Sequence, residues 1–222
     1  MSPFPFQGVI FDVDGVLFDT ERLARKIWAC VSCEMGCPQV CDHFLEFVGQ
    51  NRTDICQRMR ILWGDAFPCD SLLAACSQRT QEFMEQEGVP LKPGAVGILR
   101  FLHTKGIPTG LATSTGKERT LRRMELAGLS SYFQVMVTGD QIEHSKPDPE
   151  IYRLACRELG TEPQHTLAVE DSRNGILSAH AAGMPVVMVP DLIPPTPELE
   201  SLLYDRCPSL TDLQQRLEQL VP

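Results

Sequence analysis

The sequence predicts an α/β fold: a doubly wound parallel sheet of the Rossmann-like kind, with an inserted α-helical cap domain. Three observations support this prediction. Five short apolar runs indicate buried strands. Stretches with apolar residues at helical spacing separate the later four runs, and such alternation requires right-handed crossovers in a parallel sheet covered by helices on both faces. Between the first and second runs, by contrast, the apolar pattern is helical throughout.

The individual elements follow in order along the chain. Apolar runs rich in β-branched residues predict strands over 9–13, 109–114, 134–139, 166–171 and 185–190. Apolar residues at helical spacing predict helices over 94–106, 117–128, 148–160, 172–184 and 209–220. Glycines close the first four of these helices, as is common because glycine reaches the left-handed conformation that ends a helix: Gly106, Gly128, Gly160 and Gly183.

A helical insertion follows the first strand. Helical patterns cover residues 20–35, 52–62 and 70–87, with no buried strand between them. A crossover between parallel strands needs only about 10–12 residues, so this segment is too long to be a simple connection. We therefore expect an α/β core domain of residues 1–19 and 91–222 and a helical cap domain of residues 20–90.

Composition narrows the class of protein. The chain of 222 residues has a formal net charge of −9 and no block of Lys and Arg, whereas a nucleic-acid binder usually carries a basic face. No segment reaches the roughly 18–20 uncharged apolar residues that span a bilayer, and the first residues lack the basic start of a signal peptide. We expect a cytoplasmic monomer that binds neither nucleic acid nor membrane.

Nine cysteines are present, and four of them crowd into "CVSCEMGCPQVC". A zinc or redox site is one interpretation of Cys30, Cys33, Cys37 and Cys41. However, paired C-x-x-C knuckles are absent, and Gly36 interrupts the helix within the cluster. We expect reduced thiols that pack as small apolar groups.

Polar side chains gather where the predicted strands end, at the edge of the sheet where α/β proteins bind ligands. Each has an ordinary explanation when taken singly: Asp19 and Asp148 as helix caps, for example, or Lys146 as a solvated loop charge. Their joint placement at several strand ends favours a functional site instead. The candidate residues are Asp12, Asp14, Thr113, Ser114, Thr115, Lys146, Glu170 and Asp171.

The chemistry of this set favours phosphoryl transfer. Several neighbouring carboxylates repel one another unless a divalent cation lies among them, and a ligand set of oxygens alone suits Mg²⁺. The lysine and the hydroxyl groups are donors for an anion with several oxygens, such as phosphate. Of Asp12 and Asp14, one carboxylate could attack phosphorus to form an aspartyl-phosphate and the other could transfer protons.

Four sequence motifs resemble those of the haloacid dehalogenase superfamily, in particular its β-phosphoglucomutase-like phosphatases with a helical cap. "DVDGVLFDT" is similar to the first motif, D-x-D-G-x-x-x-D-[ST], and "LATST" to the second. "SKPDPEIY" is similar to the third motif and "VEDSRNG" to the fourth. The motifs occur in the family's order, and the resemblance covers essentially the whole chain.

The resemblance implies roles for the acidic residues. Asp12 would be the nucleophile that attacks phosphorus. Asp14 would be the general acid and then the base for the hydrolytic water. The metal ligands would be Asp12, Asp14 through its backbone carbonyl, and Asp171, with Glu170 close by; we expect Mg²⁺.

The resemblance also implies roles for residues that bind substrate. Thr113 and Lys146 would bind the phosphoryl group, with help from the backbone of Ser114. In the cap, Arg52 of "VGQNRTD" corresponds to an arginine that contacts sugar phosphate in the mutases. The position of a histidine that assists catalysis in the mutases is Ala24 here. The family's cap would close over the substrate.

The function expected from these observations is that of a Mg²⁺-dependent phosphatase. It would hydrolyse a small phosphorylated metabolite, a sugar phosphate for example, through an aspartyl-phosphate. A phosphomutase is the alternative within enzymes, and the loss of the histidine counts against it. A signalling receiver module is the alternative from another class, but receivers are shorter, and the D-x-D spacing and the cap insertion both argue against one.

Overall fold

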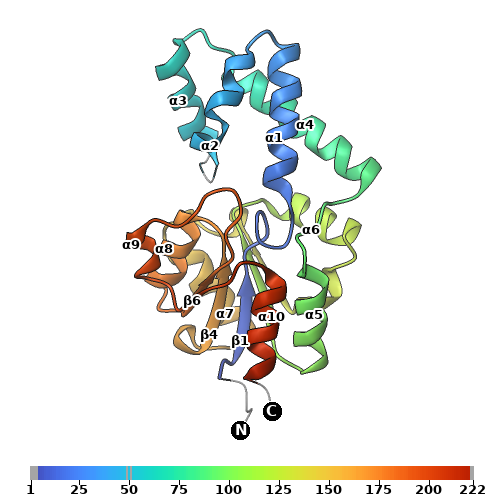
Figure 1. The fold of residues 1–222 in the computed structure, drawn as a ribbon, viewed down its shortest axis with the longest axis vertical. Helices are drawn as coiled ribbons and strands as arrows, with labels where there is room; N and C mark the ends of the chain where they lie inside the picture. The colour runs from blue at the N-terminus through green and yellow to red at the C-terminus, as the bar shows by residue number, and fades with distance from the viewer. Residues whose placement is uncertain (1–4, 49, 51, 221–222) are drawn as a thin grey trace. The chain divides into compact units, whose positions relative to one another are not determined.

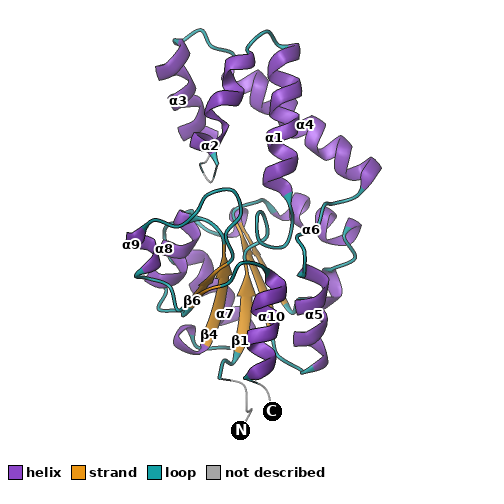
Figure 2. Cartoon of the chain, viewed as in Figure 1, coloured by secondary structure: helices purple, strands orange, loops and turns teal. Residues whose placement is uncertain are grey.

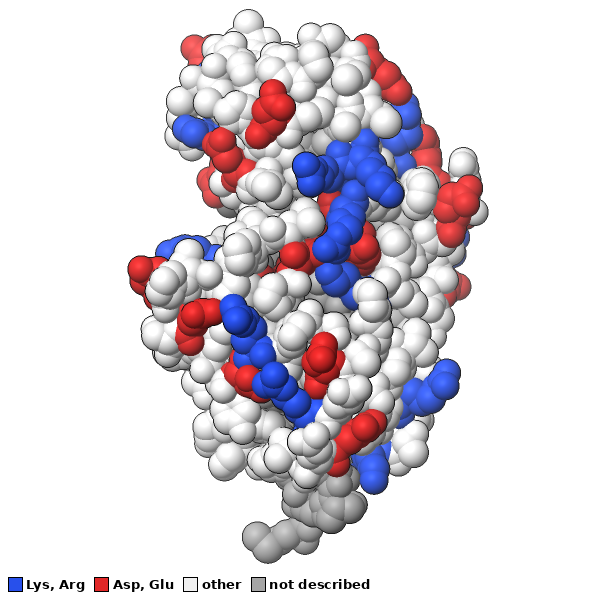
Figure 3. All heavy atoms as spheres, viewed as in Figure 1, with Lys and Arg blue, Asp and Glu red and all other residues white. Residues whose placement is uncertain are grey.

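The structure is a computed structural model that describes residues 5–48, 50 and 52–220. It divides into two compact units. One consists of Met1–Asp19 together with Val89–Pro222, and the other is Thr20–Gly88 (Figure 1). No helix among the described residues is long and apolar enough to cross a membrane. On the face in Figure 3, Asp and Glu side chains lie among the Lys and Arg side chains.

A parallel sheet forms the centre of the first unit (Figure 2). The order of its strands is β3-β2-β1-β4-β5-β6, and every neighbouring pair is parallel. This arrangement confirms the predicted doubly wound α/β fold. The strands are β1 (Gly8–Phe11), β2 (Thr109–Thr113), β3 (Val135–Thr138), β4 (Thr166–Glu170), β5 (Val186–Met188) and β6 (Asp205–Arg206).

Helices cover both faces of the sheet because its strands direct apolar side chains to both faces, as β1 shows. Val9 and Phe11 point into one apolar cluster and Ile10 into the other, since side chains alternate along a strand. All three are fully buried, as expected of a central strand in a parallel sheet. The helices are α5 (Ala95–Thr104), α6 (Lys117–Leu126), α7 (Glu150–Leu159), α8 (Arg173–Ala181), α9 (Pro197–Glu200) and α10 (Leu210–Gln219).

Each face has its own helices and its own apolar cluster. On one face, Leu99 of α5 and Leu213 of α10 pack in the cluster of Phe11. On the other, Tyr152 of α7 and Ile176 of α8 pack in the cluster of Ile10. Three short 3₁₀ turns complete the unit: η2 (Ser130–Tyr132), η3 (Gly139–Gln141) and η4 (Pro163–His165).

The second unit consists of helices and connecting loops among its described residues. It contains α1 (Thr20–Glu34), η1 (Pro38–His43), α2 (Phe44–Phe47), α3 (Arg52–Trp63) and α4 (Cys69–Glu87). Aromatic side chains contribute to its core: the ring of Trp28 lies 5.3 Å from that of Phe44 and 5.8 Å from that of Phe47, between centroids. All nine cysteines of the chain lie within the described residues, and each is a free thiol. Cys37 is buried and Cys41 is half-buried, but Cys30 and Cys33 are exposed, so the prediction that these two pack as small apolar groups is wrong.

Two segments of the first unit pair with each other at the points where the chain leaves it and returns. Phe18 and Leu91 form an antiparallel bridge. The amide of Asp19 donates to the Pro90 carbonyl at 2.8 Å, and the amide of Lys92 donates to the Leu17 carbonyl at 2.9 Å. Asp19 directly precedes the first helical residue of α1. The residues from Val89 to Lys92 therefore belong to the α/β unit.

Candidate active site

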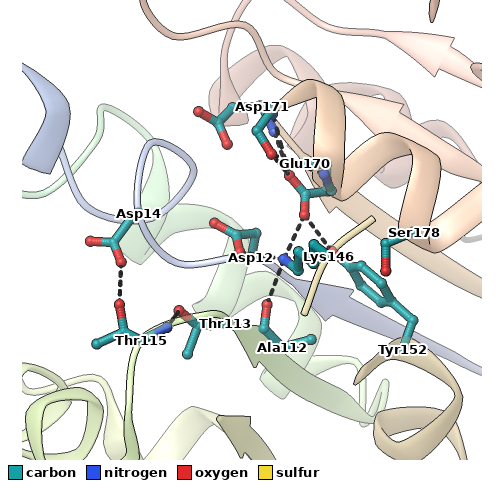
Figure 4. Close-up of polar contacts among 12 residues, drawn as sticks. Asp12, Asp14, Ala112, Thr113, Thr115, Lys146, Tyr152, Glu170, Asp171 and Ser178 are labelled. Atoms are coloured by element: carbon teal, nitrogen blue, oxygen red, sulfur yellow. Dashed lines mark hydrogen bonds and ion pairs between the residues drawn. The ribbon is translucent and has the colours of Figure 1, made fainter. Parts of the chain in front are cut away.

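The sheet brings the predicted acidic residues together because β1 and β4 are direct neighbours. Phe11 pairs with Val169, so the residues that follow them, Asp12 and Glu170, emerge side by side. The amide of Asp12 donates to the Val169 carbonyl at 2.9 Å, which extends the pairing by one residue. Asp171 follows at once. The expected convergence at the carboxyl edge of the sheet is visible in Figure 4.

Lys146 lies at the centre of this group. Its ammonium donates to Asp12 Oδ1 at 2.6 Å, to Glu170 Oε1 at 2.7 Å and to the Ala112 carbonyl at 3.1 Å. The side chain is only 5% exposed. The ordinary explanation of this lysine as a solvated loop charge is therefore wrong, because three acceptors from three strands hold it in the interior.

Burial and charge act on this cluster in opposite directions. Burial raises the pKa of Asp12 above its ordinary value; the ammonium of Lys146 opposes the rise and the carboxylate of Glu170 adds to it. Burial alone would lower the pKa of Lys146, but the carboxylates of Asp12 and Glu170 raise it above its usual value. The lysine is therefore charged, and this one cation faces two buried acids. The raised pKa of Asp12 means that its ionised form is disfavoured in this place, and a further cation bound at these carboxylates would favour it.

Glu170 is fully buried and both of its oxygens are occupied. Oε1 accepts from Lys146 and, at 2.7 Å, from the hydroxyl of Tyr152. Oε2 accepts from the amide of Asp171 and from both the amide and the hydroxyl of Ser172. Glu170, expected near the metal, lies close to Asp12 and Asp171, and its carboxylate also orients Lys146 and the start of the loop after β4.

Tyr152 was not predicted as a site residue. Its side chain is fully buried on α7, and burial raises the pKa of its phenol well above the ordinary value, so the hydroxyl remains a donor to Glu170. The ammonium of Lys146 also lies 4.9 Å from the centre of its ring. Tyr152 ends the "SKPDPEIY" motif, but its apolar helical position is the same as that of an ordinary core residue. The sequence therefore does not distinguish it.

Oxygen atoms of Asp12, Glu170 and Asp171 lie within 4.8 Å of one another, an arrangement that could hold a metal ion. Asp171 is placed against the backbone of Gly15, where a Cβ atom would lie 2.1 Å from Asp171 Oδ2. Gly15 also has a φ of +85°, so the turn after Asp14 requires glycine for two reasons. A set of carboxylate oxygens fits a hard divalent cation. Because Glu170 is already saturated with donors, Asp12 and Asp171 are the better ligands.

The carboxylate of Asp14 is not part of that acidic group. Its Oδ2 accepts from the Thr115 hydroxyl at 2.9 Å, and its Oδ1 accepts from Arg123 Nη1 at 3.0 Å. Figure 4 shows this carboxylate turned toward Thr115 and away from Lys146. Arg123, on α6, was not predicted, because nothing in the sequence distinguishes it from the two other arginines of that helix.

The predicted phosphate-binding residues lie in the loop after β2. Thr113 is buried, and its hydroxyl accepts from the amide of Thr115 at 3.1 Å. Ser114 is exposed. Gly139 lies so close that a Cβ atom there would be 2.3 Å from the Ser114 carbonyl oxygen, and its amide donates to the Thr115 carbonyl. The loop is therefore held against the end of β3.

Arg52 belongs to the helical unit, where its guanidinium donates to the carbonyl and to Oδ1 of Asp70. These contacts hold the pKa of Asp70 below its usual range. Cys56, Cys69 and Asp70 form a second group with the spacing of metal ligands. Arg52 and Arg60 both bind the same carboxylate, however, and their positive charges disfavour a cation there.

Comparison with known proteins identifies the family. The model of the family described as "Haloacid dehalogenase-like hydrolase" matches residues 9–189. The phosphorylated carbohydrates phosphatase of Thermotoga maritima is 35% identical over 181 residues, which make up 80% of this chain and 82% of the relative. Hexitol phosphatase A of Escherichia coli is 31% identical over 185 residues, 82% of each chain.

Solved structures agree with this result. A Thermotoga maritima protein given as a candidate beta-phosphoglucomutase superposes with a TM-score of 0.80 at 28% identity, covering 96% of this chain and 99% of its own. CbbY from Rhodobacter sphaeroides, solved in complex with phosphate, gives 0.77 at 27% identity and covers 94% and 96%. The predicted family and the prediction of an enzyme are confirmed. The chain belongs to the haloacid dehalogenase-like hydrolases.

Proposed function

We propose that this enzyme is a Mg²⁺-dependent phosphatase that hydrolyses a small phosphorylated metabolite through an aspartyl-phosphate. One observation carries the proposal above the others: Asp12 lies between the buried cation of Lys146 and the carboxylate of Asp171. This arrangement gives Asp12 the surroundings of a nucleophile whose target is a phosphoryl group with several negative oxygens.

Attack on phosphorus falls to Oδ2 of Asp12. Lys146 binds the other oxygen, Oδ1, and so fixes the plane of the carboxylate. The new bond joins Oδ2 to phosphorus, while the bond between phosphorus and the ester oxygen of the substrate breaks. This step forms an aspartyl-phosphate, and the ester oxygen that leaves takes up a proton as it departs.

Asp14 is proposed to move the protons of both steps. As an acid it gives a proton to the leaving oxygen, which departs as an alcohol. As a carboxylate it then takes a proton from a water molecule, whose oxygen attacks phosphorus and releases inorganic phosphate from Asp12. Each turnover therefore consumes one water molecule and restores both carboxyl groups.

Charge on the transferring phosphoryl group is neutralised by fixed donors. Lys146 supplies the ammonium, Thr113 its hydroxyl and Ser114 its backbone amide. A metal ion bound by Asp12, Asp171 and the backbone carbonyl of Asp14 would add two positive charges at the phosphoryl oxygens. Mg²⁺ is proposed because the side chains available to it offer oxygen only.

The substrate class is proposed from the relatives. The two curated relatives described above are named for phosphorylated carbohydrates and for hexitols. A sugar or sugar-alcohol phosphate is therefore the first class to test. Arg52 is proposed, from the resemblance of "VGQNRTD" alone, to contact the part of the substrate beyond its phosphate.

The test is release of inorganic phosphate from p-nitrophenyl phosphate and from a panel of sugar and sugar-alcohol phosphates. We expect activity with Mg²⁺, loss of activity with EDTA, and a loss of at least about 10³-fold in Asp12→Asn. Glu125→Gln is the matched control, because that carboxylate is 72% exposed on α6, where it pairs with Arg122. Robust hydrolysis by Asp12→Asn would contradict the proposal, as would conversion of hexose phosphate isomers without phosphate release.

A further inference from the structure

Arg123 forms a contact that the proposed chemistry does not explain. Its guanidinium binds the carboxylate of Asp14 at 3.0 Å, and the two side chains are only 16% and 27% exposed. A charge-assisted hydrogen bond in such a partly buried place is stronger than an ion pair in open solvent. The second oxygen of Asp14 is bound by Thr115 at 2.9 Å. Both oxygens of this carboxylate are therefore held, and by donors from two different elements.

The direction of α6 makes this contact possible. The helix starts at Lys117, immediately after the loop that leaves β2 at the carboxyl edge of the sheet. Side chains of a helix lean toward its N-terminus. Arg123 lies in the last turn of α6, yet its long side chain reaches back along the helix to the strand end where Asp14 lies.

A second arginine strengthens the case for a site built around Asp14. Arg119 precedes Arg123 by four residues and so lies on the same side of α6. Burial lowers the pKa of Arg119, the positive charge of Arg123 lowers it further, and the charge of Asp14 opposes this. Two guanidinium groups are thus kept close together despite their repulsion, and the carboxylate of Asp14 offsets it.

We propose that Arg123 is a positioning residue that fixes the carboxyl group of Asp14 beside the phosphate-binding loop, in the orientation that proton transfer to the leaving group requires. The inference rests on the proposed function. For that step Asp14 must carry a proton on Oδ2, with the Thr115 hydroxyl turned to accept rather than donate; the proton passes to the ester oxygen while Arg123 keeps its bond to Oδ1. Without the guanidinium, Oδ1 of Asp14 loses the 3.0 Å bond to Arg123, and the carboxyl group is held less firmly.

Leaving-group dependence separates this role from a purely structural one. An alkyl phosphate such as glycerol 2-phosphate releases a strongly basic alkoxide and depends on the acid. p-Nitrophenyl phosphate releases a stable phenolate and needs little help. The ratio kcat/KM covers the steps up to departure of the leaving group, so it excludes the later hydrolysis of the aspartyl-phosphate.

The experiment measures kcat/KM for both esters in wild type, Arg123→Met and Arg123→Lys with saturating Mg²⁺. For Arg123→Met we expect a roughly 10- to 100-fold loss with glycerol 2-phosphate, mainly in kcat, and less than about threefold with p-nitrophenyl phosphate. Arg123→Lys should recover part of the loss. Arg122→Met is the matched control, since Arg122 is 46% exposed and pairs with Glu125 on the same helix. Its kcat/KM for each of the two esters should stay at the wild-type value.

Equal losses with the two esters, or no loss with either, would overturn the role of Arg123. If Arg123→Met does not fold, Thr115→Val removes the other bond to Asp14 and should give the same selective loss, and an unselective loss in that variant would overturn the inference. A wild-type enzyme inactive toward every phosphate ester would instead overturn the proposed function itself.

Discussion

Glu170 has no direct part in the proposed chemistry, yet the position of the reacting groups depends on it. Its carboxylate binds Lys146 and Tyr152 with one oxygen and the start of the following loop with the other. Gly175 of α8 makes room for it, because a Cβ atom there would lie 1.8 Å from Oε1 and 2.2 Å from Oε2 of Glu170. The glycine is needed for space, so a larger residue at this position should displace Glu170 and, with it, Lys146.

Gly175→Ala should therefore disturb both stability and activity. The added methyl group must displace a buried carboxylate that five donors hold, and overpacking of this kind costs about 1–3 kcal/mol. We expect a loss of that size in urea unfolding, together with a lower kcat. Gly97→Ala on α5 is the control: its methyl group meets only the end of the Gln214 side chain, and alanine favours a helix by up to about 1 kcal/mol. A Gly175→Ala protein with wild-type stability and kcat would contradict this account.

Tyr152→Phe isolates the contribution of one hydroxyl group. The variant keeps the ring and loses the 2.7 Å hydrogen bond to Glu170, while Lys146 and three other donors remain. Unfolding in urea should show a loss of about 1–2 kcal/mol, with kcat within a few-fold of wild type. Tyr204→Phe provides the comparison, since that side chain is 61% exposed and should change stability by less than about 0.5 kcal/mol. If Tyr152→Phe unfolded with wild-type stability, the hydroxyl would contribute little to holding the Glu170 carboxylate.

The residues that the sequence indicates at this site differ physically from those it leaves out. Asp12 and Asp171 are polar groups at strand ends, where an apolar pattern is broken, and Lys146 belongs to the "SKPDPEIY" motif before α7; these patterns make the three residues visible. Tyr152 is part of an apolar helical face, and Arg123 is one of several charges on an amphipathic helix. Their contacts come from the packing of α7 and α6 against the sheet, which no local pattern encodes.

At the scale of elements, an ion pair ties the return segment to the sheet. Lys92 donates to Asp191 Oδ1 at 2.6 Å, and the two side chains are 9% and 2% exposed. Lys92 precedes α5, and Asp191 follows β5 by three residues. The contact links the chain's return from the helical unit to the carboxyl edge of the sheet.

Lys92→Met should destabilise the protein by about 3–5 kcal/mol, because it leaves the carboxylate of Asp191 buried without this cation. The double variant Lys92→Met/Asp191→Leu should recover most of the loss, since neither charge then remains in the interior. Glu200→Gln breaks an exposed pair with Arg206 and should cost less than about 1 kcal/mol. Unfolding in guanidinium chloride would measure the stability of all three variants. Additive losses of stability in the double variant would argue against a coupled pair.

Element prediction succeeded where local pattern and tertiary environment agree. β1, β2 and β4 are buried on both faces, so their apolar runs are continuous and easy to recognise. β6 contains only Asp205 and Arg206 and exists because both residues pair with β5. The four-residue helices α2 and α9 were likewise not predicted, because a single turn is too short to display an apolar period.

At the scale of the whole molecule, metal binding should raise the stability of the folded protein. A ligand present at ten times its Kd adds about 1.4 kcal/mol, or roughly 3–6 °C in Tm for a chain of this size. We expect Mg²⁺ to raise the Tm by this amount and EDTA to reverse the effect. Asp171→Asn should remove most of the shift, because it takes away one of the two carboxylates best placed to bind the ion. An undiminished shift in that variant would place the bound ion elsewhere.

The central position of β1 has a consequence for the order in which the protein can fold. β1 is made first during synthesis, but its two neighbours, β2 and β4, begin only at Thr109 and Thr166. The sheet therefore depends on pairings between distant parts of the chain, which form slowly. The helical unit is continuous from Thr20 to Gly88 and can form as soon as it leaves the ribosome. Asp12 is translated long before Glu170 and acquires its surroundings only after Glu170 has been added.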